Sequence, residues 1–383
     1  MKKKKILFVS TRSPFLNIFS GDRYRAKVII NYLSKKNNLD VLFSDYFPGS
    51  KKIKGRKIFF KRNLLDRMKK FVLCLFTLKP LQLGYFYSEN VNNFLKKNHG
   101  QYKTIIFHMI RSAQYLPKNY KGKKILEMTD VISKNYDQIV KSFSVFNPLT
   151  YIYFLEKILV KKYEKFCINK FDKIILTSKK DLIEAKIKNK NKFIQILNPI
   201  KLNKNIYKFK KSNYKILFIG NINYLPNKEA CKNFANEILP KINVQYPDIE
   251  FHIIGEIKYS DKMFFNKIKK TYAHGRMKKL DAVIKDSICG ICNMKIATGM
   301  QNKIFTYQSF GLPCISSHLS FKNSFLKKDK EVLVYNNENE FVFLIKKLKE
   351  NKRFAKRISK FSYDTIKKNY NENKTLSLYQ NII

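Results

Sequence analysis

Apolar runs typical of β-strands alternate with helix-like segments along the whole chain, and they do so in two successive series. The stretch Asp22–Lys35, for example, follows a strand-like run and places apolar residues at helical spacing. Strand-like runs of the first series lie at Ile6–Ser10, Asp40–Phe43, Thr104–His108, Lys124–Met128 and Lys173–Ser178. Those of the second series lie at Tyr214–Gly220, Ile249–Gly255, Ser287–Asn293, Pro313–Ser317 and Val332–Tyr335, with a helix near Asn227–Val244. Strands separated by helices pair in parallel, with helices on both faces of the sheet. The pattern therefore predicts the α/β class, with two Rossmann-like, doubly wound domains.

The polar, lysine- and asparagine-rich stretch Pro199–Asn213 separates the two series and is typical of an interdomain linker. We therefore expect an N-terminal domain over residues 1–200, a linker over 201–213 and a C-terminal domain over 214–365. Doubly wound sheets bind their ligands at the carboxyl ends of the strands. Two such domains that face each other place the expected site in the cleft between them.

Size and composition agree with two folded domains. The chain has 383 residues, of which 44% are hydrophobic, and this proportion argues against general disorder. No apolar run approaches the ~20 residues of a membrane-spanning helix. The opening MKKKKILFVS resembles a secretory signal, but its apolar part is short and no small-residue cleavage site follows, so we expect a cytoplasmic protein. Six cysteines, mostly in apolar runs, are typical of reduced core thiols.

The formal net charge of +50 has more than one explanation. Only ten of the 78 basic residues are arginine, and lysine, asparagine and isoleucine are all abundant, as AT-rich coding produces. The same charge also fits attraction to nucleic acid or to an anionic membrane face. Composition does not choose among these causes.

Several chemistries lack their motifs in this sequence. There is no G-x-G-x-x-G for a dinucleotide cofactor, no Walker P-loop, no H-E-x-x-H, and no D-x-D acidic pair of the kind that holds a metal–diphosphate. Cys289 and Cys292 have C-x2-C spacing, but they lack a second pair and lie in an apolar strand, which favours core thiols over a zinc or redox site. We therefore expect neither a cofactor nor a metal.

The segment Asn293–Ser317 carries the strongest functional signal. A predicted strand ends there, a loop holds Thr298 and Gly299, and a helix begins near Gln301. Glycine at a loop-to-helix junction allows backbone N–H groups to approach a phosphate, and the helix dipole adds positive potential there. A lysine in the first helical turn, Lys303, is unfavourable for the dipole unless an anion is bound. The alternative is an ordinary βαβ crossover with a surface lysine.

This segment, NMKIATGMQNKIFTYQSFGLPCISS, resembles the donor-binding motif of retaining glycosyltransferases of family 4, in the branch that reads roughly G-I-Q-N-K-V-L-E-A-M-A-x-G-L-P-V. FIGNINYLPNKEACKNFANEILPKI (218–242), HIIG (252–255) and HGRM (274–277) are similar to the donor domain of that branch, in the same order. ILFVSTRSPF with GDRYR (21–25), LEMTDVISKNY (126–136) and ILTSKKD (175–181) are similar to its first domain. The resemblance covers nearly the whole chain, with residues 45–100 matching loosely. It implies a GT-B fold in which a helix over 366–383 crosses back to the first domain.

The resemblance further implies that the second domain binds a nucleotide-sugar. Thr298 and Thr306 stand where the family usually has two glutamates, of which the second binds the donor ribose. A threonine hydroxyl still hydrogen-bonds a ribose, although more weakly than a carboxylate does. Asn221 stands where the family has an arginine for the diphosphate, so Lys303 and the nearby backbone carry more of that role. The implied donor-binding positions are Gly220, Asn221, Lys228, Gly275, Arg276, Met277, Gly299, Met300, Gln301, Asn302, Lys303 and Thr306.

In the first domain, the Gly21–Arg23 segment matches the family's glycine loop at the reaction centre, and Asp130 matches a position that handles the acceptor. The catalytic residues that we expect are Gly21, Asp22, Arg23, Asp130 and Lys303.

Three further residues are expected on the acceptor side: Arg25, His108 and Arg111. Arginine is rare in this chain and suits bidentate recognition of phosphate or carboxylate, which draws attention to Arg23 and Arg25. His108 and Arg111 follow the carboxyl end of a predicted strand. The alternatives are surface arginines on a helical turn and a structural histidine.

The segment Lys61–Phe76, KRNLLDRMKKFVLCLF, has the pattern of a basic amphipathic helix. Such a helix lies in a membrane interface, and the alternative is a helix packed on its own domain. Its apolar face is formed by Leu64, Leu65, Met68, Phe71, Val72, Leu75 and Phe76, and its basic side by Lys61, Arg62, Arg67, Lys69 and Lys70.

Together these features predict a retaining, metal-independent glycosyltransferase that moves a sugar from a nucleotide-sugar to a hydroxyl of a glycan or lipid-linked acceptor, in cell-surface polysaccharide synthesis. We expect it to lie peripherally on the inner face of the cytoplasmic membrane, attracted by its anionic surface, without a specific nucleic-acid partner. A sugar-nucleotide epimerase of the same fold, a catalytically inactive scaffold homologue and a nucleic-acid-binding protein stay open as alternatives.

Overall fold

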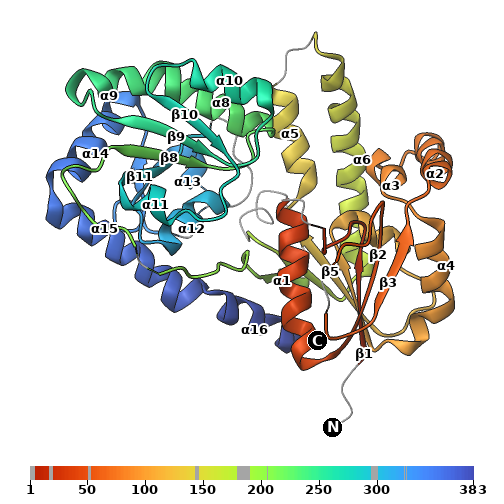
Figure 1. Ribbon diagram of the computed structural model, residues 1–383. Coiled ribbons are helices and arrows are strands. Elements are labelled where there is room, and N and C mark those ends of the chain that lie inside the picture. Colours follow the sequence, from red (N-terminus) through yellow and green to blue (C-terminus); the bar gives the residue numbers. More distant parts are fainter. Residues whose placement is uncertain are drawn as a thin grey trace. The chain divides into compact units, whose positions relative to one another are not determined.

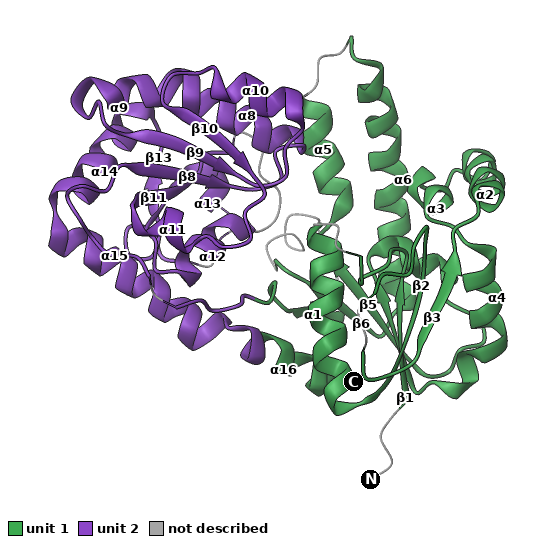
Figure 2. Cartoon of the chain, viewed as in Figure 1, with its two compact units in different colours: residues 1–199, 375–383 green, residues 200–374 purple. Residues whose placement is uncertain are grey.

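The computed structural model describes residues 5–16, 20–50, 53–142, 146–178, 190–204, 206–294, 301–322, 324 and 326–383. The chain divides into two compact units (Figure 2). Unit 1 contains residues 1–199 together with 375–383, and unit 2 contains residues 200–374. The stretch expected as a linker, 201–213, therefore groups with unit 2. Among the described residues, no helix has both the length and the apolar character needed to cross a bilayer.

Unit 1 is built on a sheet of parallel strands in the order β3-β2-β1-β4-β5-β6-β7 (Figure 1). Its strands are β1 (Lys5–Ser10), β2 (Asn38–Asp45), β3 (Lys57–Lys61), β4 (Thr104–His108), β5 (Lys123–Thr129), β6 (Lys173–Leu176) and β7 (Phe193–Gln195). Its helices are α1 (Gly21–Lys36), α2 (Leu64–Phe76), α3 (Leu81–Tyr85), α4 (Glu89–Asn98), α5 (Ile132–Ser142) and α6 (Pro148–Lys170), with short 3₁₀ turns η1 (His99–Gln101), η2 (Ile110–Tyr115) and η3 (Lys190–Lys192).

Successive residues of the central strands face opposite sides of this sheet, so unit 1 has a core on each face. On β1, Ile6 and Phe8 pack with α1, whereas Leu7 and Val9 pack with α4 and the end of α6. The helix α16 (Glu372–Ile382) adds Leu376, Tyr379 and Ile382 to the core on the α1 side.

Unit 2 has a second parallel sheet, in the order β10-β9-β8-β11-β12-β13. Its strands are β8 (Lys215–Ile219), β9 (Glu250–Ile254), β10 (Thr271–Gly275), β11 (Ser287–Cys292), β12 (Cys314–Ser317) and β13 (Leu333–Tyr335). Its helices are α8 (Leu225–Asn233), α9 (Leu239–Gln245), α10 (Tyr259–Asn266), α11 (Asp281–Lys285), α12 (Asn302–Ser309), α13 (His318–Phe321), α14 (Glu338–Glu350) and α15 (Lys352–Thr365), with π-helical turns η4 (Phe234–Ile238) and η5 (Ile366–Tyr370).

Both sheets share one strand order. In sequence numbering it is 3-2-1-4-5-6, extended by one strand in unit 1, and this is the order of doubly wound nucleotide-binding folds. The prediction of two Rossmann-like parallel sheets is confirmed. All six cysteines are buried and free, as expected of core thiols.

Candidate functional site

The central feature of unit 2 is a buried lysine at the carboxyl edge of its sheet. Lys303 lies in the first turn of α12, and only 9% of the residue is exposed. Its Nζ donates to Asn227 Oδ1 at 3.1 Å and lies 3.3 Å from Met294 Sδ and 3.5 Å from Gln301 Oε1. The described part of the chain offers it no carboxylate within ion-pair distance. A buried charge is costly unless it is paired, so this arrangement favours an anion that binds to Lys303. The alternative of a surface lysine is wrong.

The amide of Asn227 fixes the lysine to the loop after β8. Asn227 lies on α8, and its Nδ2 donates to the Asn221 carbonyl at 2.8 Å while its Oδ1 accepts from Lys303. Gly220 adjoins the same amide group. The structure therefore brings together Gly220, Asn221 and Lys303, as expected, and adds Asn227, which the sequence analysis missed in favour of its neighbour Lys228.

Tyr307 anchors the helix that carries Lys303. Its buried hydroxyl accepts from the Ile219 amide at 2.9 Å and lies 3.0 Å from the carbonyl of Ile291 and 3.2 Å from that of Leu217. Through the Tyr307 hydroxyl, α12 is therefore hydrogen-bonded to both β8 and β11. This contact sets the position of the first helical turn relative to both strand ends.

The ends of β8 and β9 approach each other closely. Gly255 has φ +143, and a Cβ on it would lie 1.7 Å from the Gly220 carbonyl oxygen, so no other residue fits there. Gly275, at the end of β10, has φ +81 and faces open space. The expected donor residues Arg276 and Met277 follow it; Arg276 is exposed and Met277 is half-buried.

The other expected donor residues are placed as follows. Lys228 forms an ion pair with Asp261 on α10, so its charge is already neutralised. The Thr306 hydroxyl donates to the carbonyl of Asn302, 3.2 Å away on the same helix. Gly299 and Met300, like Thr298, lie outside the described residues.

In unit 1, Asp22 is the centre of a charged group at the carboxyl edge of the sheet. Its Oδ2 accepts from Arg111 at 2.6 Å and from Arg12 at 3.3 Å. Burial alone would raise the pKa of Asp22, but Arg111 and Arg12 outweigh it and hold the pKa well below its usual range. Burial lowers the pKa of Arg111 to about 10 in spite of Asp22, so both groups stay charged at neutral pH.

Arg25 and His108 meet a carboxylate that the sequence analysis missed. Glu127, fully buried on β5, accepts from Arg25 Nε at 2.9 Å and contacts His108 Nδ1 at 2.8 Å. Burial opposes ionisation, yet Arg25 and His108 lower the pKa of Glu127 to about 2. The signal for this residue was present, because a glutamate between apolar strand residues is informative.

Arg25 does not face a ligand in this structure. The residue is 1% exposed, and its remaining N–H groups donate to the carbonyls of Ile196 and Leu197, the Asn198 side chain and the Tyr379 hydroxyl. The second ring nitrogen of His108 lies 3.0 Å from the Asp22 carbonyl, so His108 is likewise an interior residue. Both join strands and helices of unit 1 rather than presenting a surface to an acceptor.

The remaining expected residues lie around this centre. Arg23 forms an ion pair with Asp45 at 3.0 Å, and the Asp130 carboxylate accepts from Thr177 at 2.9 Å. Gly21 opens α1 in an exposed position, and a Cβ on it would meet no atom within 4 Å.

Two strained residues flank Glu127. Met109, directly after β4, has φ 65, and Thr129, at the end of β5, has φ 72. The Met109 amide donates to the Glu127 carbonyl, and the Thr129 hydroxyl lies 3.3 Å from the Glu127 carboxylate. Positive φ in such residues costs free energy and concentrates at functional sites.

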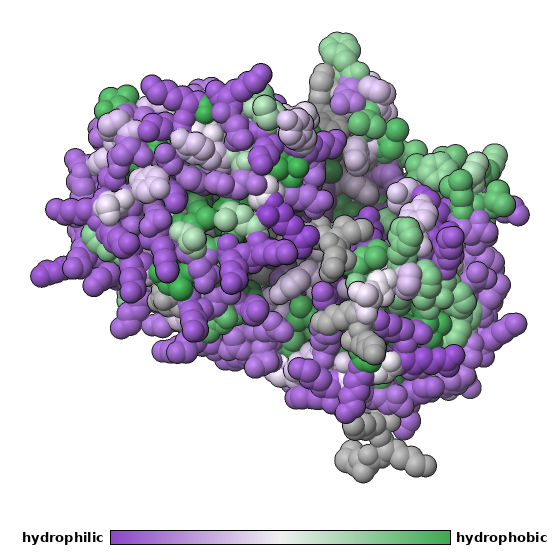
Figure 3. All heavy atoms as spheres, viewed as in Figure 1, coloured by the Kyte–Doolittle hydropathy of each residue, from purple (hydrophilic) through white to green (hydrophobic). Residues whose placement is uncertain are grey.

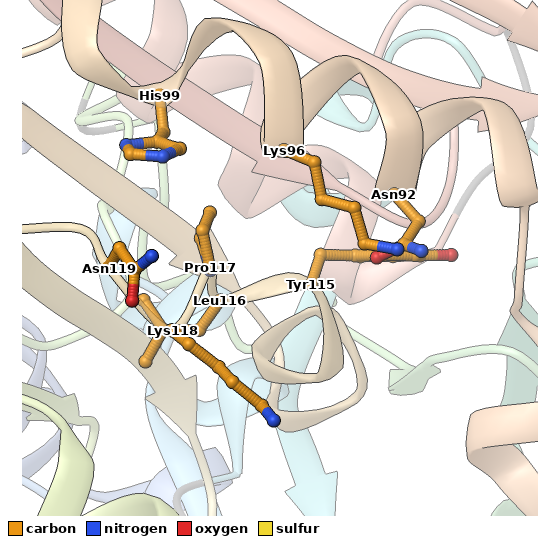
Figure 4. Close-up of a pocket in the computed structure, with 8 residues that line it drawn as sticks. All are labelled: Asn92, Lys96, His99, Tyr115, Leu116, Pro117, Lys118 and Asn119. Atoms are coloured by element: carbon orange, nitrogen blue, oxygen red, sulfur yellow. The ribbon is translucent and has the colours of Figure 1, made fainter.

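A separate hollow of about 500 Å³ lies in unit 1 between α4 and the segment after η2 (Figure 4). Asn92, Lys96 and His99 line it from the helix side. None of the expected site residues lines this hollow, and we assign it no role.

Comparison with known proteins finds a family that is similar to most of unit 2. Residues 213–351 match the family model described as "Glycosyl transferases group 1". The chain is therefore similar to this family over most of unit 2. An alignment of 285 residues, which covers 70% of this chain and 72% of the relative, gives 22% identity to the "Uncharacterized 44.6 kDa protein in cps region" of Klebsiella pneumoniae.

Solved structures resemble nearly the whole chain. Sucrose-phosphate synthase from Thermosynechococcus elongatus superposes with a TM-score of 0.73 at 12% identity and covers 99% of both chains. Anabaena HepE in complex with UDP gives a TM-score of 0.69 at 11% identity over 98% of both chains. A variant of S. aureus TarM in complex with fondaparinux, α-GlcNAc-glycerol and UDP gives 0.66 at 11% identity over 99% of both chains. The chain has the GT-B fold, as expected.

Proposed function

We propose that this protein is a retaining, metal-independent glycosyltransferase that uses a nucleotide-sugar donor. The observation that carries the proposal is the buried Lys303 ammonium, whose hydrogen-bond partners among the described residues are all neutral, at the strand edge where such folds bind their ligands. The family match of unit 2 supports it, and so do the UDP and UDP-glucose complexes of HepE. We place the donor diphosphate at Lys303, next to Asn227 and the first turn of α12.

The chemistry follows from the charge that develops on the diphosphate as it leaves the sugar. A fixed cation inside the protein stabilises that charge more strongly than water does, because it needs no reorganisation during the reaction. Lys303 and the positive end of the α12 dipole supply this stabilisation without a metal ion. Retention follows from the family 4 resemblance, in which the leaving phosphate takes the proton of the acceptor on the same face of the sugar.

The acceptor that we propose is a glycan or a lipid-linked precursor in cell-surface polysaccharide synthesis. The relative from the cps region of Klebsiella pneumoniae supports this setting. Unit 1 is the acceptor side, and its charged group around Asp22 lies at the carboxyl edge of the sheet.

We also propose peripheral binding to an anionic membrane surface through unit 1. The apolar face expected for the helix at 61–76 is left exposed on α2, of which only Cys74 is buried. Figure 3 shows apolar side chains gathered over α2, α3 and the outer part of α6. A hydrogen bond joins α3 to α6, because the backbone amide of Gln82 donates to the Glu156 carboxylate at 3.0 Å. The exposed apolar residues of the first half of α6 are Leu149, Tyr151, Ile152, Phe154, Leu155 and Ile158.

The direct test is a thermal-shift screen of UDP-, GDP-, ADP- and dTDP-sugars in the presence of EDTA. A ligand that binds only the folded state raises Tm by an amount set by its affinity. We expect sugars of one nucleotide class to raise Tm. With water as the acceptor, we also expect slow hydrolysis of that nucleotide-sugar, measured as release of the nucleoside diphosphate. A screen in which no nucleotide-sugar raises Tm contradicts the proposal.

A further inference from the structure

Three arginines surround one phenylalanine at the carboxyl edge of the unit 1 sheet. The guanidinium carbons of Arg111, Arg12 and Arg62 lie 4.1, 5.0 and 5.5 Å from the centre of the Phe86 ring. They come from segments after β4, β1 and β3. Because parallel strands end at the same edge of a sheet, this convergence is a property of the fold rather than of one loop.

The positive charge of this group is not balanced within the described residues. Arg12 and Arg111 share one carboxylate, Asp22. Arg62 is buried, and within the described part of the chain it donates to the carbonyls of Thr11 at 2.6 Å and Ser44 at 3.1 Å, while its Nε has no partner there.

Arg23 and Asp45 are two further charged residues beside this group of arginines. They pair with each other. Among the described residues, the guanidinium groups of Arg12, Arg23, Arg62 and Arg111 therefore outnumber the carboxylates of Asp22 and Asp45 by two. Burial lowers the pKa of Arg62, and the nearby Arg67 and Arg12 add to this effect, although Asp45 opposes it. Like charges held together in this way favour a bound anion.

Arg12 gives an anion access to the group. Its side chain is 33% exposed, and within the described residues its hydrogen bond to Asp22 uses Nη1 alone. Nε and Nη2 of Arg12 have no hydrogen bond to any residue that the structure describes. A guanidinium offers paired donors that match the oxygens of a phosphate or a carboxylate.

The arginine group continues directly into the exposed apolar surface of α2 and α3. The ring of Phe86 contacts that of Tyr85 at 4.9 Å, and the Arg67 guanidinium of α2 lies 4.3 Å from the Tyr85 ring. Tyr85 is half exposed, and most of the apolar side chains of α2 next to it are exposed as well. Charge and apolar surface thus adjoin each other.

We infer that unit 1 binds an acceptor carrying a phosphate or diphosphate ester of a long apolar alcohol. The anionic oxygens bind Arg12 and Arg111, Arg62 raises the local positive potential, and the apolar chain lies against α3 and α2. This inference rests on the proposed glycosyltransferase function and names its acceptor class.

Titration calorimetry with farnesyl diphosphate as the probe tests the inference, beside inorganic pyrophosphate, farnesol and glucuronic acid. We expect farnesyl diphosphate to bind more tightly than pyrophosphate and far more tightly than farnesol. Arg12→Gln should weaken it by about tenfold or more, as the loss of a charge-assisted hydrogen bond does. Arg357→Gln, on α15 of unit 2, is the control of equal charge and should bind as the unchanged protein does.

Two further variants separate the parts of the site. Tyr85→Ser should weaken farnesyl diphosphate binding while leaving pyrophosphate binding unchanged, because it removes an apolar ring and leaves Arg12 and Arg111 in place. Lys303→Met should leave farnesyl diphosphate binding intact, whereas Arg12→Gln should leave UDP-sugar binding intact, so failure of the acceptor inference and failure of the donor proposal give different results.

Three results would overturn the inference. One is farnesyl diphosphate binding that depends on Lys303 and not on Arg12, since the probe then reports the donor site. The second is Arg12-dependent binding of glucuronic acid without binding of farnesyl diphosphate, which assigns the site to an acidic sugar. The third is an equal loss of affinity for farnesyl diphosphate in Arg12→Gln and Arg357→Gln, which would show that binding depends on the net charge of the protein rather than on this site.

Discussion

At the residue scale, substitution of Lys303 should affect donor binding and the thermal stability of the protein in opposite directions. Replacing it with methionine keeps the length of the side chain near Met294, Phe218 and the buried Cys231, but removes a buried charge that has no carboxylate partner among the described residues. We expect Lys303→Met to keep or raise Tm, because an apolar side chain of similar volume replaces a costly buried cation. The same variant should lose the donor-induced Tm shift and about 10²–10³ in turnover, as expected when one group that stabilises developing charge is removed.

The matched control for this prediction is Lys232→Met, on α8 of the same unit, where the lysine pairs with Glu229 near the surface. Its donor-induced Tm shift should equal that of the unchanged protein. A full donor-induced shift in Lys303→Met would remove Lys303 from the donor site.

Glu127 gives a prediction for pH dependence. The folded-state pKa of about 2 lies below the ordinary value of 4.5, so the ionised carboxylate stabilises the fold fully above pH 4.5 and loses this effect as the pH falls towards 2. Glu127→Gln leaves Arg25 buried without its counter-ion and should destabilise unit 1 by about 3–5 kcal/mol at pH 7. Urea unfolding at pH 7 and pH 3 should show the difference from the unchanged protein shrinking at the lower pH.

Glu229→Gln, an exposed carboxylate of unit 2, is the reference variant and should change little at either pH. Equal stability of Glu127→Gln and the unchanged protein at pH 7 would show that Arg25 does not depend on this carboxylate.

The sequence predicted the position of Lys303 but not its surroundings. The sequence pattern predicts a lysine in the first turn of a helix. The buried surroundings of Lys303 include Asn227, which lies 76 residues earlier in the chain. Glu127 and Arg25 are 102 residues apart. Such partners come together only through the strand order, so single-sequence patterns identify candidates and leave their pairing undetermined.

At the element scale, three strands at sheet edges escaped the sequence analysis, whereas the edge strand β13 was expected. The segments β3, β7 and β10 each end a sheet, and the buried central strands were all expected within a few residues. Edge strands are short and carry polar residues, so they lack the apolar runs that identify a central strand. The helix expected at 61–76 begins at Leu64 because Lys57–Lys61 forms β3.

Helix α2 supplies the prediction for the membrane surface. Leu65, Phe71 and Leu75 are all exposed, so replacing the three with serine should leave the fold intact. The triple variant should fail to sediment with anionic liposomes, because it removes the apolar contact that an interfacial helix makes. High salt should weaken binding of the unchanged protein by screening its electrostatic part.

A triple serine variant on exposed polar positions of α14, Asn339, Lys346 and Glu350, is the control and should sediment normally. Unfolding of the α2 variant, seen as a lowered Tm, would instead place this face in the core of unit 1.

At the scale of the whole molecule, the chain leaves unit 1 at residue 199 and returns to it at residue 375. Removing residues 375–383 takes Leu376, Tyr379 and Ile382 out of the core and deprives Arg25 of a hydrogen bond. Each large apolar residue lost from a core costs about 2–5 kcal/mol, so the sum is comparable to the stability of a domain.

We therefore expect the truncated protein to show fast amide hydrogen exchange across β1, β4 and α1, with protection of β8 and β11 retained. Tyr379→Phe is the milder comparison and should cost about 1–3 kcal/mol, since it removes the hydroxyl alone. Unchanged protection of unit 1 after truncation would show that α16 is dispensable.

The return of the chain has a consequence for its synthesis. Residues 375–383 leave the ribosome after all of unit 2, yet they belong to the core of the unit that was made first. During synthesis, the core of unit 1 on the α1 side therefore stays incomplete, with its apolar residues partly exposed, until unit 2 has been translated. Premature termination a few residues before the C-terminus therefore destabilises unit 1, which is synthesised first, rather than unit 2.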